Sequence, residues 1–285
     1  MRKSIYILFL FILVGCIKEV DVDIARANEK IVVEGRIENG EVAEVYLTKS
    51  VAMFEEFDFN DVSKYLITDA VVTISNGSLI DTLKPEIDFN VIPPIVYTTN
   101  SPSFVGVENG SYNLKIEVDG KILTSTTTIP NQVKLDSVWI REEDGFPGKG
   151  FVWAHFLDPD TLGNGYRWEQ KLTTESKFVS PLGSTFDDKI INGEAFDFFA
   201  QKPFDSDNDT IDRTEAIYYD ITDTVIIKFS TIDKASFNFW RTLDVSKSNN
   251  GNPFAAPVSP ITNINGGLGV FTGYYVSYDT AVYKP

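Results

Sequence analysis

Three pairs of alternating apolar segments, each interrupted by Asn-Gly or Asp-Gly, constrain the fold more than any other feature of the chain. The dipeptides are Asn39-Gly40, Asn76-Gly77 and Asp119-Gly120. Both residues of such a pair tolerate positive φ, which two-residue hairpin turns require. From Tyr112 to Val118 every second residue is apolar, which is typical of a half-buried antiparallel strand. We therefore expect three hairpins with two-residue turns in residues 30–132.

The second half of the chain continues the strand pattern. The segments LDSVWI, FVWAHFL, YRWEQKL and VFTGYYVSY are strand-like and are separated by Gly- or Pro-containing turns. Short strands with regular turn signals favour sandwiches. We predict a mainly β chain with two antiparallel β-sandwich-like domains, an immunoglobulin- or transthyretin-like one at residues 30–132 and a β-rich one at residues 133–285.

One short helix is expected in the second domain. Thr231 or Asp233 can cap its start, and Gly251 lies just past its end. Three residues on one side, spaced three and four apart, form a stripe: Phe237, Trp240 and Asp244. We interpret the aromatic members of the stripe as core packing.

The first 16 residues have the pattern of a lipoprotein leader. Arg2 and Lys3 precede an apolar run from Ile5 to Val14, which is shorter than the roughly 20 residues of a membrane-spanning helix. LVGC resembles the lipobox of bacterial lipoproteins, in which cleavage leaves a lipid on the Cys. Cys16 is the single cysteine, and acylation would leave no free thiol in an oxidising compartment. We predict a signal peptide at residues 1–15, lipid on Cys16 and a tether over residues 16–29; an ordinary signal peptide is the alternative.

The charge of the chain excludes nucleic acid as an expected partner. There are 25 basic and 41 acidic residues, a formal net charge of −16, and removal of residues 1–15 takes away two more basic ones. Phosphate binding depends on basic clusters, and no Lys/Arg run lies outside the leader. The stretch IKEVDVD after Cys16 resembles the acidic signals that direct Bacteroidota lipoproteins to the cell surface, although a charged linker has similar composition.

Catalytic motifs are scarce in the sequence. His155 is the single histidine and no GxSxG motif is present, which excludes a multi-histidine metal centre and a nucleophile elbow. A Ser-His-Asp triad through His155 has no supporting partner motif. Two carboxylates can meet in a cleft, as in glycoside hydrolases, but the sequence does not select a pair. We expect a protein without enzymatic activity, with a carboxylate-dependent hydrolase as a remaining alternative.

The segment DSDNDTID is the one metal-like pattern. Its four aspartates offer the oxygen ligands that calcium prefers: Asp205, Asp207, Asp209 and Asp212. An EF-hand loop has Gly at its sixth position and Glu at its twelfth, where this chain has Thr210 and Ala216. A calcium loop and a solvated acidic loop both stay open, and no other cofactor is expected.

Three glycines lie near the C-terminus, at Gly266, Gly267 and Gly269. A strand-like segment follows them, whereas a phosphate-binding loop follows a strand and opens a helix. We therefore interpret the glycines as permitting a tight backbone path into the last strand.

Several segments together resemble a family of Bacteroidota lipoproteins of unknown function, the domain-of-unknown-function 4249 type. They are CIKEVDVD, IVVEGRI, LTSTTTIP, LDSVW, Asn252-Pro253-Phe254 and the block from Asn263 to Phe271. The resemblance covers nearly the whole mature chain. It implies no established activity, but members are typically associated with TonB-dependent outer-membrane receptors, so it implies a place and a partner.

We expect a lipid-anchored accessory or binding protein of the outer membrane, displayed on the cell surface and working with a TonB-dependent receptor. A glycan-binding surface lipoprotein is the alternative, because aromatic residues make up 13% of the chain. Most of these rings belong in the cores, so a contiguous exposed aromatic patch is what would favour glycan binding.

Overall fold

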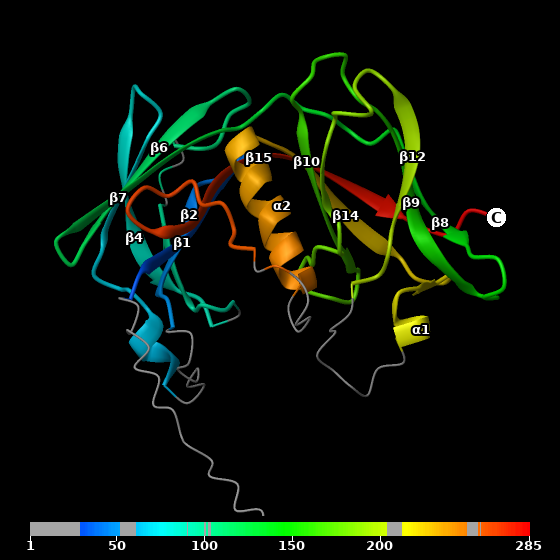
Figure 1. Cartoon of the computed structure of the whole chain (residues 1–285), viewed down its shortest axis with the longest axis horizontal. Coiled ribbons are helices and arrows are strands. Elements are labelled where there is room, and N and C mark those ends of the chain that lie inside the picture. Colours follow the sequence, from blue (N-terminus) through cyan, green and yellow to red (C-terminus); the bar gives the residue numbers. More distant parts are fainter. Residues whose placement is uncertain are drawn as a thin grey trace, which may run out of the picture.

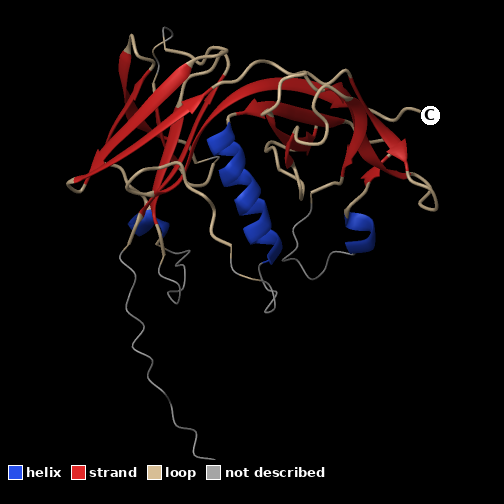
Figure 2. Ribbon diagram, turned by 45° about the horizontal axis from the view of Figure 1, so that its top comes forward, coloured by secondary structure: helices blue, strands red, loops and turns tan. Residues whose placement is uncertain are grey.

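The computed structural model describes residues 29–51, 61–89, 91–99, 101, 104–203, 213–249, 256 and 258–285. Within them the protein is mainly β, with two β lobes and the helix α2 (Lys234–Asn249) lying between them on one side of the strands (Figures 1 and 2). The predicted β class, sandwich-like packing and helix are confirmed. None of the described helices has the length and apolar character needed to cross a bilayer.

The elements follow the chain in a simple order. The first lobe contains β1 (Ile31–Glu38), β2 (Glu44–Lys49), the 3₁₀ helix η1 (Val62–Tyr65), β3 (Val71–Ser75), β4 (Ile80–Ile87), β5 (Ile95–Thr98), β6 (Ser111–Val118) and β7 (Lys121–Thr128). The second contains β8 (Ser137–Glu142), β9 (Lys149–Leu157), β10 (Gly165–Leu172), β11 (Thr185–Asp187), β12 (Ala195–Ala200), α1 (Arg213–Ala216), β13 (Tyr219–Asp220) and β14 (Val225–Ile232), and α2 and β15 (Leu268–Ala281) follow.

The last strand joins the two lobes. An eleven-stranded sheet has the order β11-β10-β14-β15-β1-β2-β5-β4-β3-β6-β7, and a smaller sheet contains β12, β9 and β13, with β8 also paired to β9. Strand β15 runs parallel to β1 up to the pair Glu38↔Tyr274. From Tyr274 onward it runs antiparallel to β14. Pairing of β1 with a strand more than 230 residues away makes one continuous sheet, while the division into domains at residue 132 stays a prediction.

Glycine is required where β15 meets β1. Gly269 has φ +102°, and a Cβ atom there would collide with the carbonyl oxygen of Val33. Only a residue without a Cβ atom fits such a close approach at positive φ. The strand that follows the glycines is β15, as expected from the sequence.

The third hairpin has the predicted turn. Val118 pairs with Lys121, and both central residues, Asp119 (φ 51°) and Gly120 (φ 70°), have positive φ. This is the backbone that a two-residue turn matched to the strand twist requires.

The other two hairpins form, but their strands are not in the register predicted for two-residue turns at Asn-Gly. In the second, Ser75 pairs with Ile80, so the turn lies one residue later. Asn76 Oδ1 accepts hydrogen bonds from the backbone N–H groups of Ser78 (3.1 Å) and Leu79 (2.9 Å). The Asn side chain thus supplies a local turn of its own and moves the register.

In the first hairpin, Arg36 pairs with Glu44, which leaves a longer connection than predicted. A turn does form at Asn39-Gly40, because Glu41 N–H donates to Glu38 O (3.1 Å). Asn39 is also bonded to β15: its N–H donates to Tyr274 O (3.1 Å), and its Oδ1 accepts from Val276 N (2.6 Å). The local turn is therefore kept, while the strands leave it in a register that differs by one residue from that of a two-residue hairpin.

Two hydrophobic cores occupy the lobes. The first is mainly aliphatic and packs side chains of β1 and β2 against those of β3 and β6, among them Val33, Val45, Ile74 and Leu114. The second contains a larger share of aromatic side chains, among them Phe156, Tyr166, Trp168 and Phe229. The alternation predicted for Tyr112 to Val118 is confirmed, since apolar residues there are buried and polar ones exposed. The immunoglobulin- or transthyretin-like topology of the first lobe stays a prediction.

Candidate ligand-binding cleft

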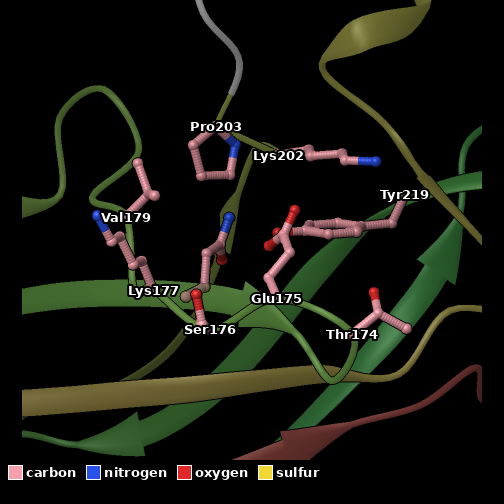
Figure 3. Close-up of a pocket in the computed structure, with 9 residues that line it drawn as sticks. Thr174, Glu175, Ser176, Lys177, Val179, Lys202, Pro203 and Tyr219 are labelled. Atoms are coloured by element: carbon pink, nitrogen blue, oxygen red, sulfur yellow. The ribbon is translucent and has the colours of Figure 1, made fainter. Parts of the chain in front are cut away.

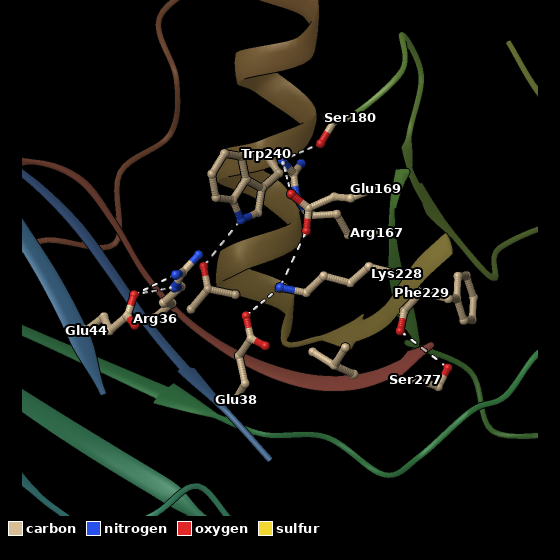
Figure 4. A network of polar contacts seen from close by, with 12 residues as sticks. Arg36, Glu38, Glu44, Arg167, Glu169, Ser180, Lys228, Phe229, Trp240 and Ser277 are labelled. Carbon is tan, nitrogen blue, oxygen red and sulfur yellow. Dashed lines mark hydrogen bonds and ion pairs between the residues drawn. The ribbon is translucent and has the colours of Figure 1, made fainter. Parts of the chain in front are cut away.

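A cleft of about 880 Å³ opens where β1, β10, β14 and β15 meet helix α2. Figure 4 shows its polar side chains converging from these elements. Binding sites for small molecules typically have volumes of roughly 300–1,000 Å³ and combine apolar walls with a few placed polar groups. The size and position of the cleft make it the strongest candidate site among the described residues.

Lys228 is the centre of the ion-pair network on one wall. Its Nζ lies 2.5 Å from Glu38 Oε1 and 3.9 Å from Glu169 Oε2, and its side chain is only 9% exposed. An ammonium group taken out of water needs such partners, because an unpaired buried charge is strongly unfavourable. The network ties β14 to β1 and β10, so it also holds the cleft walls together.

Arg167 lies on the same wall, and its guanidinium stacks on the indole ring of Trp240, 3.8 Å from the ring centroid. Arg167 Nη2 donates to Ser180 Oγ (2.7 Å), and Nη1 donates to Thr185 Oγ1 (3.4 Å). Its Nε is buried and has no hydrogen-bond partner among the described residues. A buried donor without a partner calls for a water or a ligand atom.

Two acidic groups of the cleft are affected by burial. Burial raises the pKa of the Asp244 carboxyl, although the nearby Arg167 guanidinium opposes the shift. Asp244 Oδ2 is buried without a hydrogen-bond partner in the described part of the chain. Burial likewise raises the pKa of the Tyr274 phenol. The phenol is therefore neutral at ordinary pH, and the carboxyl is easier to protonate than a solvated one.

Other residues that line the cleft are apolar. They include Phe178, Pro181, Leu182 and Leu243. Because Lys228 is already paired with carboxylates, the cleft is suited to holding an amphipathic ligand through both polar and apolar contacts. The carboxylates of Glu38 and Glu169 both lie beside the Lys228 ammonium group. This arrangement differs from that of a glycoside hydrolase, in which one carboxyl acts as an acid and the other as a base or nucleophile.

A smaller pocket of about 410 Å³ adjoins the cleft and shares Val179, Lys202 and Pro203 with it. Figure 3 shows Glu175 and Tyr219 pointing into it. Burial raises the pKa of the Tyr219 phenol, and nearby carboxylates add to the shift. The shared residues make the pocket an extension of the cleft.

The sequence predicted the helix α2 that lines the cleft, but it did not reveal the cleft itself. Asp233 begins α2 as predicted, because its Oδ1 accepts from Ser236 N (2.8 Å). Phe237 is buried in a small core cluster and Trp240 packs against that cluster, as expected, but Trp240 and Asp244 also line the cleft. A signal for the missed Lys228 existed, since it interrupts the apolar run VIIKFSTI.

His155 has carboxylate partners. Its Nδ1 lies 2.6 Å from Asp197 Oδ1, and its Nε2 lies 4.0 Å from Asp136 Oδ2. Its side chain is 39% exposed on the outer face of the smaller sheet. Neither recorded ring-nitrogen contact is with a serine hydroxyl, so the described residues give a triad through His155 no support.

The same outer face carries a group of packed rings, here called the aromatic surface: Phe146, Phe151, Trp153, Phe199 and Tyr218. Ring centroids lie 4.7–5.3 Å apart from one neighbour to the next. Phe146 is 40% exposed and Phe199 is 49% exposed. This is a contiguous aromatic patch with exposed members, a feature that the sequence could not reveal.

Other predicted site residues lie outside the described residues. These are the lipid-attachment residue Cys16 and the four candidate calcium ligands, Asp205, Asp207, Asp209 and Asp212. Lipidation and calcium binding therefore stay predictions. Among the residues that the structure does describe, no cluster of three or more metal-ligating side chains is present.

Comparison with known proteins gives a family but no activity. No curated protein matches the chain. A solved structure titled "Cytokine receptor complex - Crystal form 1A" aligns with 87% of this chain and 94% of its own, at 8% identity and a TM-score of 0.26, which is too low to carry an argument. The model of the family described as "Domain of unknown function (DUF4249)" matches residues 17–279. The chain therefore belongs to the DUF4249 family.

Proposed function

We propose that this protein is a lipid-anchored binding protein of the outer membrane, that it works without catalysis alongside a TonB-dependent receptor, and that it holds its ligand in the cleft. The leader pattern ending at Cys16 supports the anchor, and the resemblance to Bacteroidota lipoproteins supports the place and partner. The acidic stretch after Cys16 supports display on the cell surface.

The cleft carries the binding part of the proposal. Its walls come from both ends of the chain, since β1 contributes Glu38 while β14 and α2 contribute Lys228 and Trp240. Arg167 Nε and Asp244 Oδ2, both in this cleft, have no hydrogen-bond partner in the described residues. A ligand with a hydrogen-bond acceptor for the first and a donor for the second would satisfy groups that are costly to leave unpaired.

The test is affinity purification of the tagged protein from detergent-solubilised outer membrane, followed by mass spectrometry of bound proteins and small molecules. We expect a TonB-dependent receptor and a small-molecule ligand with the wild type. Trp240→Ala should lose the ligand, because it removes the ring that lines the cleft and supports Arg167.

Trp139→Ala is the matched control. Trp139 is also a partly exposed tryptophan, but it lies on β8, away from the cleft. It should retain the ligand. Equal loss in both variants, or wild-type preparations that never contain a receptor, would contradict the proposal.

The anchor and its location need a separate test. Cys16→Ser should abolish labelling by an alkyne fatty acid, because no other cysteine can accept the lipid. External protease should cut the protein on intact cells. Protection on intact cells together with cleavage after lysis would indicate a periplasm-facing protein instead.

Glycan binding is the second candidate, and the aromatic surface favours it. Phe199 and Phe146 are exposed members of a continuous patch, and rings of this kind often serve binding when they gather on a surface. Calorimetric titration with maltoheptaose and cellohexaose tests it. Here Phe199→Ala should weaken binding and Trp240→Ala should not, which is the opposite of the pattern expected for the cleft.

A further inference from the structure

The loop between β4 and β5 exposes large apolar side chains to an unusual degree. Phe89 and Ile92 are each 86% exposed, and Ile87 is 67% exposed. Single exposed apolar residues are ordinary, but a local group of them marks a contact with a membrane or a partner. In the described part of the loop, Asp88 N–H donates to Pro94 O (2.9 Å) and Val91 N–H donates to Asp88 O (3.4 Å).

Strand pairing fixes where this loop lies. Ile87 pairs with Ile95 at the loop end of β4 and β5, and β5 runs antiparallel to β2 through Val45↔Tyr97. Strand β2 in turn pairs with β1 so that Lys49 lies opposite Ile31. The loop therefore leaves the sheet at the same end at which the chain enters β1, the end that faces downward in Figure 1.

The length of chain before β1 limits how far this end can be from the anchor. Fourteen residue steps separate Cys16 from Lys30, which span at most about 50 Å when fully extended. Such a tether keeps the first lobe near the bilayer, but a single-chain connection does not fix which face of the lobe is turned toward the lipid.

We propose that the β4–β5 loop inserts Ile87, Phe89 and Ile92 into the surface of the lipid bilayer beside the anchor and thereby orients the protein. This rests on the proposed lipidation of Cys16. The segment EIDFNVIPPIV contains two acidic residues and no basic one, so the contact is apolar and does not depend on anionic lipid headgroups. In this orientation, the strand ends that lie opposite the loop would face away from the membrane.

The experiment uses the lipidated protein with one added cysteine. Because the acylated Cys16 has no free thiol, Phe89→Cys provides the single site for an environment-sensitive nitrobenzoxadiazole label. The protein is reconstituted into phosphatidylcholine vesicles. We expect the emission of the label to shift to shorter wavelength and to be quenched by lipids that carry bromine in their acyl chains.

Ile80→Cys is the matched control, because Ile80 is 79% exposed at the opposite end of the same strand. Its label should keep an aqueous spectrum. The label at position 89 should also return to an aqueous spectrum when Ile87→Ser and Ile92→Ser are added, which excludes insertion driven by the label itself. Circular dichroism checks that the variants fold.

The outcomes separate the loop from the anchor. Equal, aqueous spectra at positions 89 and 80 in acylated protein would overturn the loop proposal and leave the anchor intact. A shift at position 89 that requires added outer-membrane proteins would also overturn it in favour of a protein partner. Mass spectrometry that finds Cys16 without lipid would refute the anchor. In that case Cys16→Ser is added so that position 89 again carries the single label. The labelled protein is then added to vesicles, and an unshifted spectrum would overturn the loop proposal as well.

Discussion

The two cores of the molecule differ in their share of aromatic side chains. The first is dominated by Val, Ile and Leu on alternating strands, whereas in the second Phe156 contacts the rings of Tyr166, Phe186, Phe196, Phe198 and Phe229. An aliphatic core forms between regular strands with period-two alternation. A core that contains many packed rings depends more on the shape of each ring and on its neighbours. The comparison teaches that the first lobe should tolerate conservative changes better than the second.

The largest effect is expected from Phe156→Ala. The ring is fully buried and has five aromatic neighbours, and truncation of a buried Phe typically costs about 3–5 kcal/mol. Urea unfolding followed by fluorescence should show this loss. Phe89→Ala is the control, because an 86% exposed ring should change stability by less than about 0.5 kcal/mol.

The counterpart in the first core is Leu114→Ala, which is expected to cost about 2–5 kcal/mol. Since β15 pairs with strands of both lobes, we expect Leu114→Ala and Phe156→Ala to lower the midpoint of one common transition. Two separate transitions, each moved by one variant alone, would show that the cores fold independently and would sharpen the division at residue 132.

Gly269→Ala tests the pairing of β15 with β1, which joins the two lobes. Strained φ costs about 1–3 kcal/mol, and the added Cβ atom would also meet Val33 O. Hydrogen exchange should show loss of protection in β1 and β15 first. Gly40→Ala is a suitable control, because it has positive φ (80°) but no atom within 4 Å of the added Cβ. Equal effects of the two substitutions would mean that the close approach is unimportant.

Asp233→Ala should lower the stability of the protein by a smaller amount, because Asp233 joins α2 to β7 of the first lobe. Its carboxylate caps α2 through Ser236 N, and it also accepts from Thr127 Oγ1 (2.7 Å) and Thr128 N (3.0 Å) of β7. Loss of a cap costs about 0.5–2 kcal/mol, and the lost contacts to β7 should bring the result to the upper part of that range. Thermal unfolding measures it. Recovery with Asp233→Asn would show that hydrogen bonding, rather than charge, is what the site needs.

The smallest effect is a pH dependence from Asp244. Its pKa is raised in the folded state, so the folded chain binds the proton more tightly than the unfolded chain does. Its contribution to the free energy of unfolding therefore falls as pH rises from its ordinary value of 3.8 through the raised one. Asp244→Asn should be more stable than the wild type at pH 7, and the difference should shrink below that ordinary value. The matched control is Asp144→Asn at an exposed position; a trend in this control equal to that of Asp244→Asn would contradict the assignment.

Local signals in the sequence predicted much of the fold but little of the site. The turn at Asp119-Gly120 and the start of α2 at Asp233 follow from short-range chemistry that operates wherever those residues stand. The predicted hairpin register was wrong at both Asn-Gly pairs, where the bond of Asn39 to β15 or the side chain of Asn76 competed with a regular two-residue hairpin. Trp240 packs against a small core cluster as predicted, but the helical spacing of apolar residues could not show that its ring also lines a cleft.

The sequence by itself determined the β class, the alternation of the strands and the position of the main helix, because these depend on neighbours within a few residues. Only the tertiary structure decided that β15 lies parallel to β1. This pairing also brings Glu38 into contact with Lys228, 190 positions away in the chain. Such a contact depends on which strand edges find each other in the folded chain, and period-two alternation is the same for every possible partner. The cleft is therefore a product of long-range pairing.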